Sequence, residues 1–235
     1  MKLAYDFHIH TAASPCGDQW MSPHNIVNMA LLNGLDAIAI TDHNTCANCA
    51  SVMKVGRAKG LLVIPGMEIE CQEEFHTIAL FPSLEAAYEV ERSVKEGLPS
   101  LKNRIDIFGN QWKLDEEDEI VGEIDQFLLT ATSLTAQEVF RKVREVGGII
   151  YPAHIDRQSY SILSNLGFIP PELGVNAIEI SKGAPKEVYE RNYINYQLLQ
   201  SSDAHYLQDI SERRHFLSAE ACTIYEIFKV IDKKT

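Results

Sequence analysis

Short apolar runs alternate with helical stretches along this chain. The predicted strands are residues 3–9, 36–41, 61–64, 75–81, 149–153, 177–180 and 197–201. The predicted helices are residues 22–33, a stretch ending near residue 59, residues 83–96, 135–146 and 186–193, and a stretch from about residue 223. Strands that alternate with helices in this way are typical of βαβ units and a parallel sheet.

Turn and capping residues mark several of the helix ends. Ser22 before Pro23 predicts a helix start, with the serine as cap and the proline in the first turn. Thr135 and Glu138 have the spacing of a capping box. Gly34 and Gly60 are expected to end the first two helices.

Residues 97–132 break this regularity. They are polar and acidic, show no clear period, and are long for a loop in a compact domain. We therefore expect an irregular insertion or lid there. No internal repeat and no composition shift divides the chain, so residues 1–235 are predicted to form a single α/β domain.

The composition is that of an ordinary soluble protein. Of the 235 residues, 46% are hydrophobic and 23% are charged. No apolar run approaches the roughly 18 residues that a membrane span needs. The N-terminus lacks the apolar core of a signal peptide. We expect a cytoplasmic protein with no membrane partner.

The five cysteines do not indicate a disulfide framework, because their number is odd and the chain is long enough to fold without cross-links. Cys46 and Cys49 form a C-x-x-C pair, but no second pair accompanies it to make a zinc ribbon.

The formal net charge of −12 argues against an extended nucleic-acid surface, which needs clustered lysine and arginine. It does not exclude a small phosphorylated substrate, because bound metal ions reverse the local field.

Ligand-type side chains stand at or just after the predicted strands. In a parallel barrel all strand C-termini open on one face, so these side chains are expected to converge there. They are His8, His10, Asp42, His43, Glu68, Glu70, His76, His154, Asp203 and His205.

Each of these motifs is ambiguous when taken alone. His8 and His10 are two residues apart on a strand and so point to one face, where they can hold one ion or form an ordinary surface pair. Glu68 can bridge two metals through its two oxygens or be a solvated charge, and His76 and His154 can be core histidines. His24 and His215 are not assigned to the site. The mixture of imidazole and carboxylate suits zinc, iron or manganese.

The motifs in their order resemble those of the PHP (polymerase and histidinol phosphatase) family. They are Asp6-Phe7-His8-Ile9-His10-Thr11, Thr41-Asp42-His43-Asn44, Gly66-Met67-Glu68-Ile69-Glu70, His76, Pro152-Ala153-His154 and Ser202-Asp203-Ala204-His205. The resemblance implies a distorted (β/α)7 TIM-like barrel with two to three divalent metal ions at the C-terminal rim of its strands.

The resemblance also assigns ligands to each ion. His8, His10, Glu68 and Asp203 would hold the first ion, and Glu68, His76 and His154 the second. His43 and His205 would hold a third, completed by a residue from the loop after the first strand. Many relatives have His or Asp there; this chain offers Asp18, with Cys16 as the alternative.

The implied activity is hydrolysis of a phosphate ester, with a metal-bridging hydroxide as the expected nucleophile. Glu68, Asp203 and His205 are the expected catalytic residues, the last two as proton relays. Arg157 is expected to bind the substrate phosphate through its fork of donors, and Lys182 is a second candidate for that role.

Three other hypotheses remain open. A metal-dependent amidohydrolase also begins with H-x-H but often uses a carbamylated lysine as the bridge, where this chain has Glu68. A non-catalytic, metal-stabilised regulatory module would show erosion of the ligand set. A proofreading nuclease would be expected with an attached polymerase.

Overall fold

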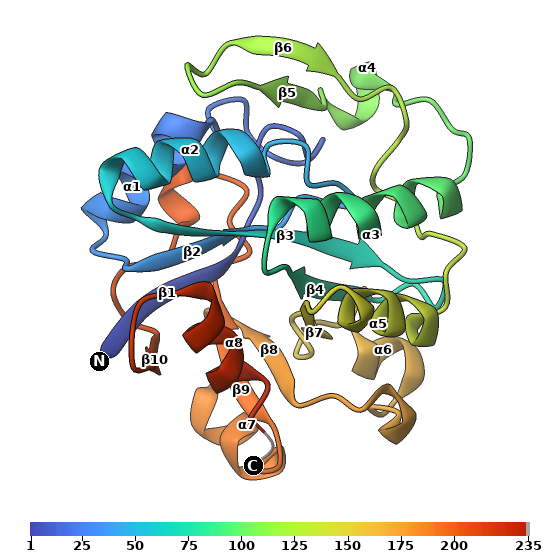
Figure 1. The fold of residues 1–235 in the computed structure, drawn as a ribbon. Helices are drawn as coiled ribbons and strands as arrows, with labels where there is room; N and C mark the ends of the chain where they lie inside the picture. The colour runs from blue at the N-terminus through green and yellow to red at the C-terminus, as the bar shows by residue number, and fades with distance from the viewer. Residues whose placement is uncertain (234–235) are drawn as a thin grey trace.

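The structure is a computed structural model that describes residues 1–233, and its centre is a curled half-barrel sheet in an α/β fold (Figure 1). Its strands follow one another in the order β10, β1, β2, β3, β4 and β7. Their bounds are β1 (Lys2–Ile9), β2 (Ala37–Ile40), β3 (Leu62–Glu70), β4 (His76–Leu80), β7 (Ile149–Pro152) and β10 (Phe216–Ser218).

A separate parallel pair, β8 (Ala177–Ser181) and β9 (Gln197–Ser201), lies between β7 and β1. The N–H of Ile155, just after β7, donates to the carbonyl of Glu179 in β8 at 2.9 Å. The N–H of His10, just after β1, donates to the carbonyl of Ala204 beyond β9, also at 2.9 Å. Residues far apart in the chain are thereby brought to one rim.

The helices α1 (Pro23–Leu32), α2 (Cys49–Lys59), α3 (Leu84–Gly97) and α5 (Ala136–Glu145) cover the outside of the sheet (Figure 1). Ile227 and Ile231 of α8 (Ile224–Ile231) pack instead in the apolar cluster on its inner side. The shorter helices are α4 (Ile105–Phe108), α6 (Ile162–Leu166), η1 (Pro171–Leu173), α7 (Lys186–Asn192) and η2 (Leu207–Asp209). The strands are buried on both faces, as seven of the eight residues of β1 show. Among residues 1–233, no helix combines the length and the apolar character needed to cross a bilayer.

The helix ends confirm most of the predicted caps. The Thr135–Glu138 capping box of α5 is present in both directions, and Gly60 ends α2 with a φ of +78°. Ser22 stands at the N-cap of α1 with Pro23 in the first turn, as predicted, but its side chain makes no capping bond. Its hydroxyl donates instead to the Asp118 carboxylate at 2.7 Å.

The expected all-parallel strand order is wrong at β4, which runs antiparallel to both β3 and β7. β3 also continues past residue 64 to Glu70, because its second half pairs with β4. A Cβ on Gly66 would lie 2.9 Å from the carbonyl oxygens of both Ala79 and Ile40, so only glycine fits between the two neighbouring strands. The reversal of β4 sets His76 opposite Glu70, at the rim where β3 ends.

A bulge in β1 changes which of its side chains face inward. Asp6 pairs with Ile38 and Ile9 with Ile40, so β1 advances three residues while β2 advances two. Before the bulge, Leu3, Tyr5 and Phe7 pack in the inner apolar cluster with residues of β4, β7 and β9. After it, Ile9 packs in the outer cluster under the helices. His8 and His10 therefore point inward, which strict alternation with Leu3 and Phe7 would not allow.

Residues 97–132 contain α4 and a hairpin of β5 (Trp112–Leu114) and β6 (Ile120–Glu123), which lie above α2 and α3 in Figure 1. Hydrogen bonds join this segment to the loops after β1 and β2. The N–H of Trp112 donates to the Ala12 carbonyl at 2.8 Å, and the Asn44 amide donates to the carbonyls of Leu128 and Thr130 at 2.9 and 3.0 Å. That the segment acts as a lid stays a prediction.

The buried carboxylate of Glu91 on α3 anchors the loop after β2. It accepts from the Thr45 hydroxyl at 2.6 Å, the Cys46 N–H at 3.0 Å and the Lys95 ammonium at 2.9 Å. Burial raises the pKa of Glu91, but the bonds from Thr45 and Lys95 outweigh it and hold the pKa below its usual range.

We expect Glu91→Gln to reduce the free energy of unfolding at pH 7 by about 1–3 kcal/mol, since buried donors lose a charged acceptor. A carboxylate whose pKa is lowered by folding stabilises the folded state fully at pH values above its ordinary pKa. This stabilisation is lost as the pH falls through the pKa of the folded state. The difference from wild type should therefore shrink below about pH 4. Urea unfolding at pH 7 and at about pH 3 measures it, with the exposed Glu145→Gln as the control. Equal stability of the two variants at pH 7 would contradict the anchoring role.

Candidate metal centre

Glu68, near the end of β3, lies at the centre of a buried cluster of imidazoles. A carboxylate has about four lone-pair sites, and here five histidines approach it, so direct hydrogen bonds do not satisfy the whole set. The nitrogen to oxygen distances are 3.2 Å for His8, 3.0 Å for His76 and 3.2 Å for His154 to Oε1, and 3.0 Å for His43 and 3.4 Å for His10 to Oε2.

A second carboxylate, that of Asp203, faces the same histidines. Its Oδ1 lies 3.1 Å from Nε2 of His8 and 3.1 Å from Nε2 of His10. The two Nε2 atoms are themselves 3.1 Å apart. Two imidazole nitrogens and two carboxylates thus converge on one small volume.

The outer nitrogens of these two imidazoles indicate which atom carries the proton. Nδ1 of His8 lies 2.8 Å from the buried Glu179 carboxylate, which accepts a hydrogen bond from the Nδ1–H group. Nδ1 of His10 lies 3.0 Å from the Ser14 hydroxyl, and that hydroxyl donates its own proton to Asp42 at 2.7 Å. In the neutral form of each ring, Nε2 carries a lone pair directed at carboxylate oxygens. Burial lowers the pKa of His8, but Asp203, Glu179 and Glu68 outweigh it and raise the pKa well above its ordinary value, so this ring must release a proton to bind a metal ion.

An imidazole lone pair and a carboxylate oxygen repel each other unless a proton or a metal ion lies between them. Neutral imidazole nitrogens and carboxylate oxygens are the ligands of zinc, iron and manganese, so the donor set fits divalent metal ions. Three groups have donor atoms that all lie within 4.8 Å of one another: His8, His10, Glu68 and Asp203; His43, Glu68 and His76; and His10, His43 and His205.

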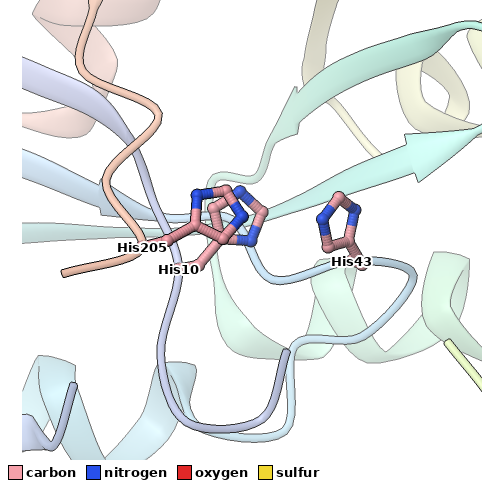
Figure 2. Close-up of side chains that lie close together, drawn as sticks. All are labelled: His10, His43 and His205. Carbon is pink, nitrogen blue, oxygen red and sulfur yellow. The ribbon is translucent and has the colours of Figure 1, made fainter. Parts of the chain in front are cut away.

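The third group joins the ends of β1, β2 and β9 (Figure 2). The rings of His10 and His205 stack with centroids 4.2 Å apart, and His43 lies 4.5 Å from His10. His205 is the most exposed of the three.

The predicted third-site partners lie next to this group. The N–H of Asp18 donates to the His205 carbonyl at 2.9 Å, but its carboxylate accepts from the N–H of Trp20 at 2.9 Å. Burial raises the pKa of the Cys16 thiol, and the carboxylates of Glu68 and Asp203 raise it further. The assignment of Asp18 or Cys16 to the third ion stays a prediction.

The charges of the cluster suit cation binding at neutral pH. Burial raises the pKa of Glu68, but the imidazoles of His76, His8 and His43 outweigh it and hold the pKa well below its usual range. His8 and His10 have the same effect on Asp203. Burial and the neighbouring His205 lower the pKa of His10 to about 4, so this ring is neutral near pH 7.

Strained backbone holds two of the cluster residues in place. His154 has a φ of +27° and Asp203 a φ of +52°, in the left-handed region that side-chain-bearing residues avoid. Such positions cost roughly 1–3 kcal/mol each and gather at functional sites.

Two other acidic residues at strand ends, Asp42 and Glu70, belong to none of the three groups of possible metal ligands. The Asp42 carboxylate accepts from the Thr11 N–H and hydroxyl and from Ser14, each at 2.7 Å, and so shapes the loop after β1. Glu70 lies outside the three groups, with its Oε2 3.9 Å from Nε2 of His76.

Glu179 is a site residue that sequence reasoning missed. It lies in the middle of β8, where an acidic residue interrupts the apolar run Ala177–Ser181. Its carboxylate is buried and orients His8 from behind. An acid within a buried strand was the available indication.

The two candidate phosphate-binding residues differ in position. Nη1 of Arg157 lies 2.6 Å from Oδ2 of Asp203, and its side chain is 43% exposed, so it reaches both the cluster and solvent. Nζ of Lys182 donates to the Asp209 carbonyl at 2.8 Å, and its predicted role in phosphate binding stays a prediction. His24, which was not assigned to the site, pairs with Asp118 instead.

The PHP domain family model matches residues 6–150, more than half of the chain, so the chain belongs to the PHP domain family. This confirms the resemblance seen in the motifs. The 5'-3' exoribonuclease Rnm of Escherichia coli is 38% identical over 78 residues, which are 32% of this chain and 26% of that protein. The chain spans less than half the length of the curated relatives it matches first.

Solved structures of low sequence identity share the fold. The endonuclease Q of Pyrococcus furiosus is 20% identical with a TM-score of 0.74, covering 99% of this chain and 56% of the other. A Bifidobacterium adolescentis protein assigned to the metal-dependent phosphoesterases is 18% identical with a TM-score of 0.65, covering 99% and 97%.

The expectation of no extended nucleic-acid surface is wrong, whereas a small phosphorylated substrate stays a prediction. An endonuclease Q structure with a TM-score of 0.73, 20% identical over 98% of this chain and 56% of that one, holds a 27-mer duplex substrate, and matched relatives are exoribonucleases. The net charge of a whole chain does not set the field at one site, because several of its acids lie inside a cluster suited to cations.

We expect Glu179→Gln to weaken metal binding by about 10- to 100-fold, since a neutral amide supports the basicity of His8 less than a carboxylate does. Titration of the metal-free protein against a competing chelator measures the affinity. Glu187→Gln, an exposed change on α7, is the control. Unchanged affinity in the Glu179 variant would show that this carboxylate does not orient the ligand.

Proposed function

We propose that the chain is a metal-dependent phosphoester hydrolase that acts on nucleotides or on the ends of nucleic-acid strands. The observation that carries this proposal is the convergence of imidazole nitrogens on two ionised, buried carboxylates. Family membership and the nuclease relatives support the phosphoester as the bond that is broken.

The proposal places this site at the rim of a distorted (β/α)7 barrel. Its walls would be β1, β2, β3, β4, β7, β8 and β9. The hydrogen bonds from Ile155 to Glu179 and from His10 to Ala204 support closure between the sheet and the β8–β9 pair.

The number of donor atoms supports two bound ions, and a third ion would need one further ligand. Nδ1 of His10 is engaged by Ser14, so this ring has only Nε2 to offer and can serve one ion. With His10 assigned to the group of His8 and Asp203, a third ion would keep His43 and His205 and need Asp18 or Cys16 as a further ligand. Zinc, iron and manganese suit these donors.

Divalent cations in such a site act as Lewis acids and lower the pKa of water from 15.7 to about 7. Glu68 presents its two oxygens to two of the three groups and would bridge them. If only two ions bind, His205 would be the cluster member best placed to exchange a proton with a leaving group, because it is partly exposed and its Nδ1 is fixed by the Asp203 carbonyl at 3.0 Å, which leaves Nε2 free. Arg157 would hold a phosphate oxygen beside Asp203.

A substrate panel tests the reaction class. The purified chain, with its metal content measured, is assayed on nucleotides, 5'-phosphorylated oligonucleotides, phosphomonoesters, amides and lactones. We expect hydrolysis of the phosphoesters and a loss of at least about 100-fold in kcat/KM for Glu68→Gln, because even outer-shell changes cost about 10- to 100-fold. Glu89→Gln, an exposed change on α3, is the control. A metal-loaded protein that cleaves only amides or lactones would establish the amidohydrolase alternative.

Arg157→Ala is expected to lower kcat/KM for phosphoesters by about 10- to 100-fold, since hydrogen bonds to charged groups are worth roughly 1.5–3 kcal/mol. Arg157→Lys should recover only part of the loss, because an ammonium lacks the bidentate fork. Steady-state kinetics of both variants beside Arg141→Ala, an exposed change on α5, measure the effect. Full activity in Arg157→Ala would show that Arg157 does not bind the substrate phosphate.

A further inference from the structure

The ring of Tyr160 covers one side of the metal cluster. It stacks on the imidazole of His76 with centroids 5.0 Å apart and an angle of 22° between the planes. His76 is only 9% exposed, whereas Tyr160 is 52% exposed. The tyrosine therefore packs one face against a cluster residue and presents a large part of its ring to solvent beside the cluster.

The backbone holds this ring in a costly conformation. Tyr160 has a φ of +55°, which is an outlier for a bulky residue. Its carbonyl accepts from the N–H of His76 at 2.9 Å, and the next residue, Ser161, caps α6 and donates to the Arg157 carbonyl at 2.8 Å. Strain that the surroundings maintain in this way gathers at ligand-binding positions.

One short loop carries three groups that border the cluster. His154 contacts Glu68, Arg157 contacts Asp203, and Tyr160 stacks on His76. The N–H of Arg157 donates to the His154 carbonyl at 3.0 Å, and Ser161, next to Tyr160, donates to the Arg157 carbonyl, so the three are fixed relative to one another. The loop thus combines a cation suited to phosphate with an exposed aromatic face.

We propose that the exposed face of Tyr160 stacks on the base of the substrate while the phosphate lies at the metal cluster. This inference rests on the proposed function and narrows it to substrates that carry a nucleobase. Every base has a π-face, so a single aromatic platform selects for a base without reading its sequence. Removal of such a platform is expected to cost about 5- to 100-fold in KM.

Substrates that differ only in the base provide the test. Adenosine 5'-monophosphate is compared with ribose 5-phosphate, and a 5'-phosphorylated oligonucleotide is compared with the same strand lacking its first base. In Tyr160→Ala we expect KM to rise about 5- to 100-fold for the base-bearing member of each pair, with little change in kcat. The base-lacking members should be hydrolysed by wild type and variant alike. The two pairs distinguish a free nucleotide from a strand end as the source of the base.

Two further variants separate stacking from support of His76. Tyr160→Phe keeps the ring and should retain the wild-type preference for base-bearing substrates. Tyr225→Ala, an exposed tyrosine beside Gly148 and Ile149 at the opposite ends of the strands, is the matched control. An equal loss on base-bearing and base-lacking substrates in Tyr160→Ala would assign the residue to supporting His76 and overturn the stacking proposal. Wild-type protein inert towards all four phosphoesters would instead overturn the proposed function, and the stacking proposal with it.

Discussion

The attraction between the buried Glu68 carboxylate and the imidazoles around it is the interaction on which the rest of the structure depends. An ionised carboxylate with almost no exposure is strongly disfavoured unless positive charge or donors surround it. Here those neighbours come from β1, from the start of β4 and from the loops after β2 and β7. The ends of these elements must meet at one point for the charge to be tolerated. The same requirement creates a site in which divalent cations fit.

Several local departures from regular structure bring the donors to that point. The bulge in β1 turns His8 and His10 inward, and the reversed direction of β4 brings His76 to the same rim. Gly66 lets β3 pass between its neighbours, and positive φ angles set the backbone at His154 and Asp203. Each departure costs stability locally, and the contacts of the cluster and of its outer partners offset that cost.

A layer of outer residues holds the inner donors in orientation. Glu179 fixes His8, Ser14 and Asp42 fix His10, and Arg157 pairs with Asp203. Residues 97–132 support the same loops from outside through Trp112 and Asn44. The loop of His154, Arg157 and Tyr160 adds a phosphate-binding cation and an aromatic surface to one side of the cluster, where the rest of a substrate would extend.

The sequence by itself determined the family, the α/β class and most of the cluster. Strand-end histidines and acids can be recognised in the sequence because ligand chemistry restricts residue type and because the motifs keep their order along the chain.

The features that only the tertiary structure decided depend on contacts between residues distant in the chain. Alternation along β1 cannot reveal that His8 changes face, since the bulge depends on pairing with β2. An apolar run such as residues 75–81 carries no indication of strand direction, so the alternation of strands and helices predicts a parallel β4 where the structure has an antiparallel one. Asp42 and Glu179 are both acids near strands, and only their neighbours distinguish them from ligands such as Glu68. The net charge of −12 misled about nucleic acid because a sum over the whole sequence carries no position, whereas a substrate responds to the field at one site.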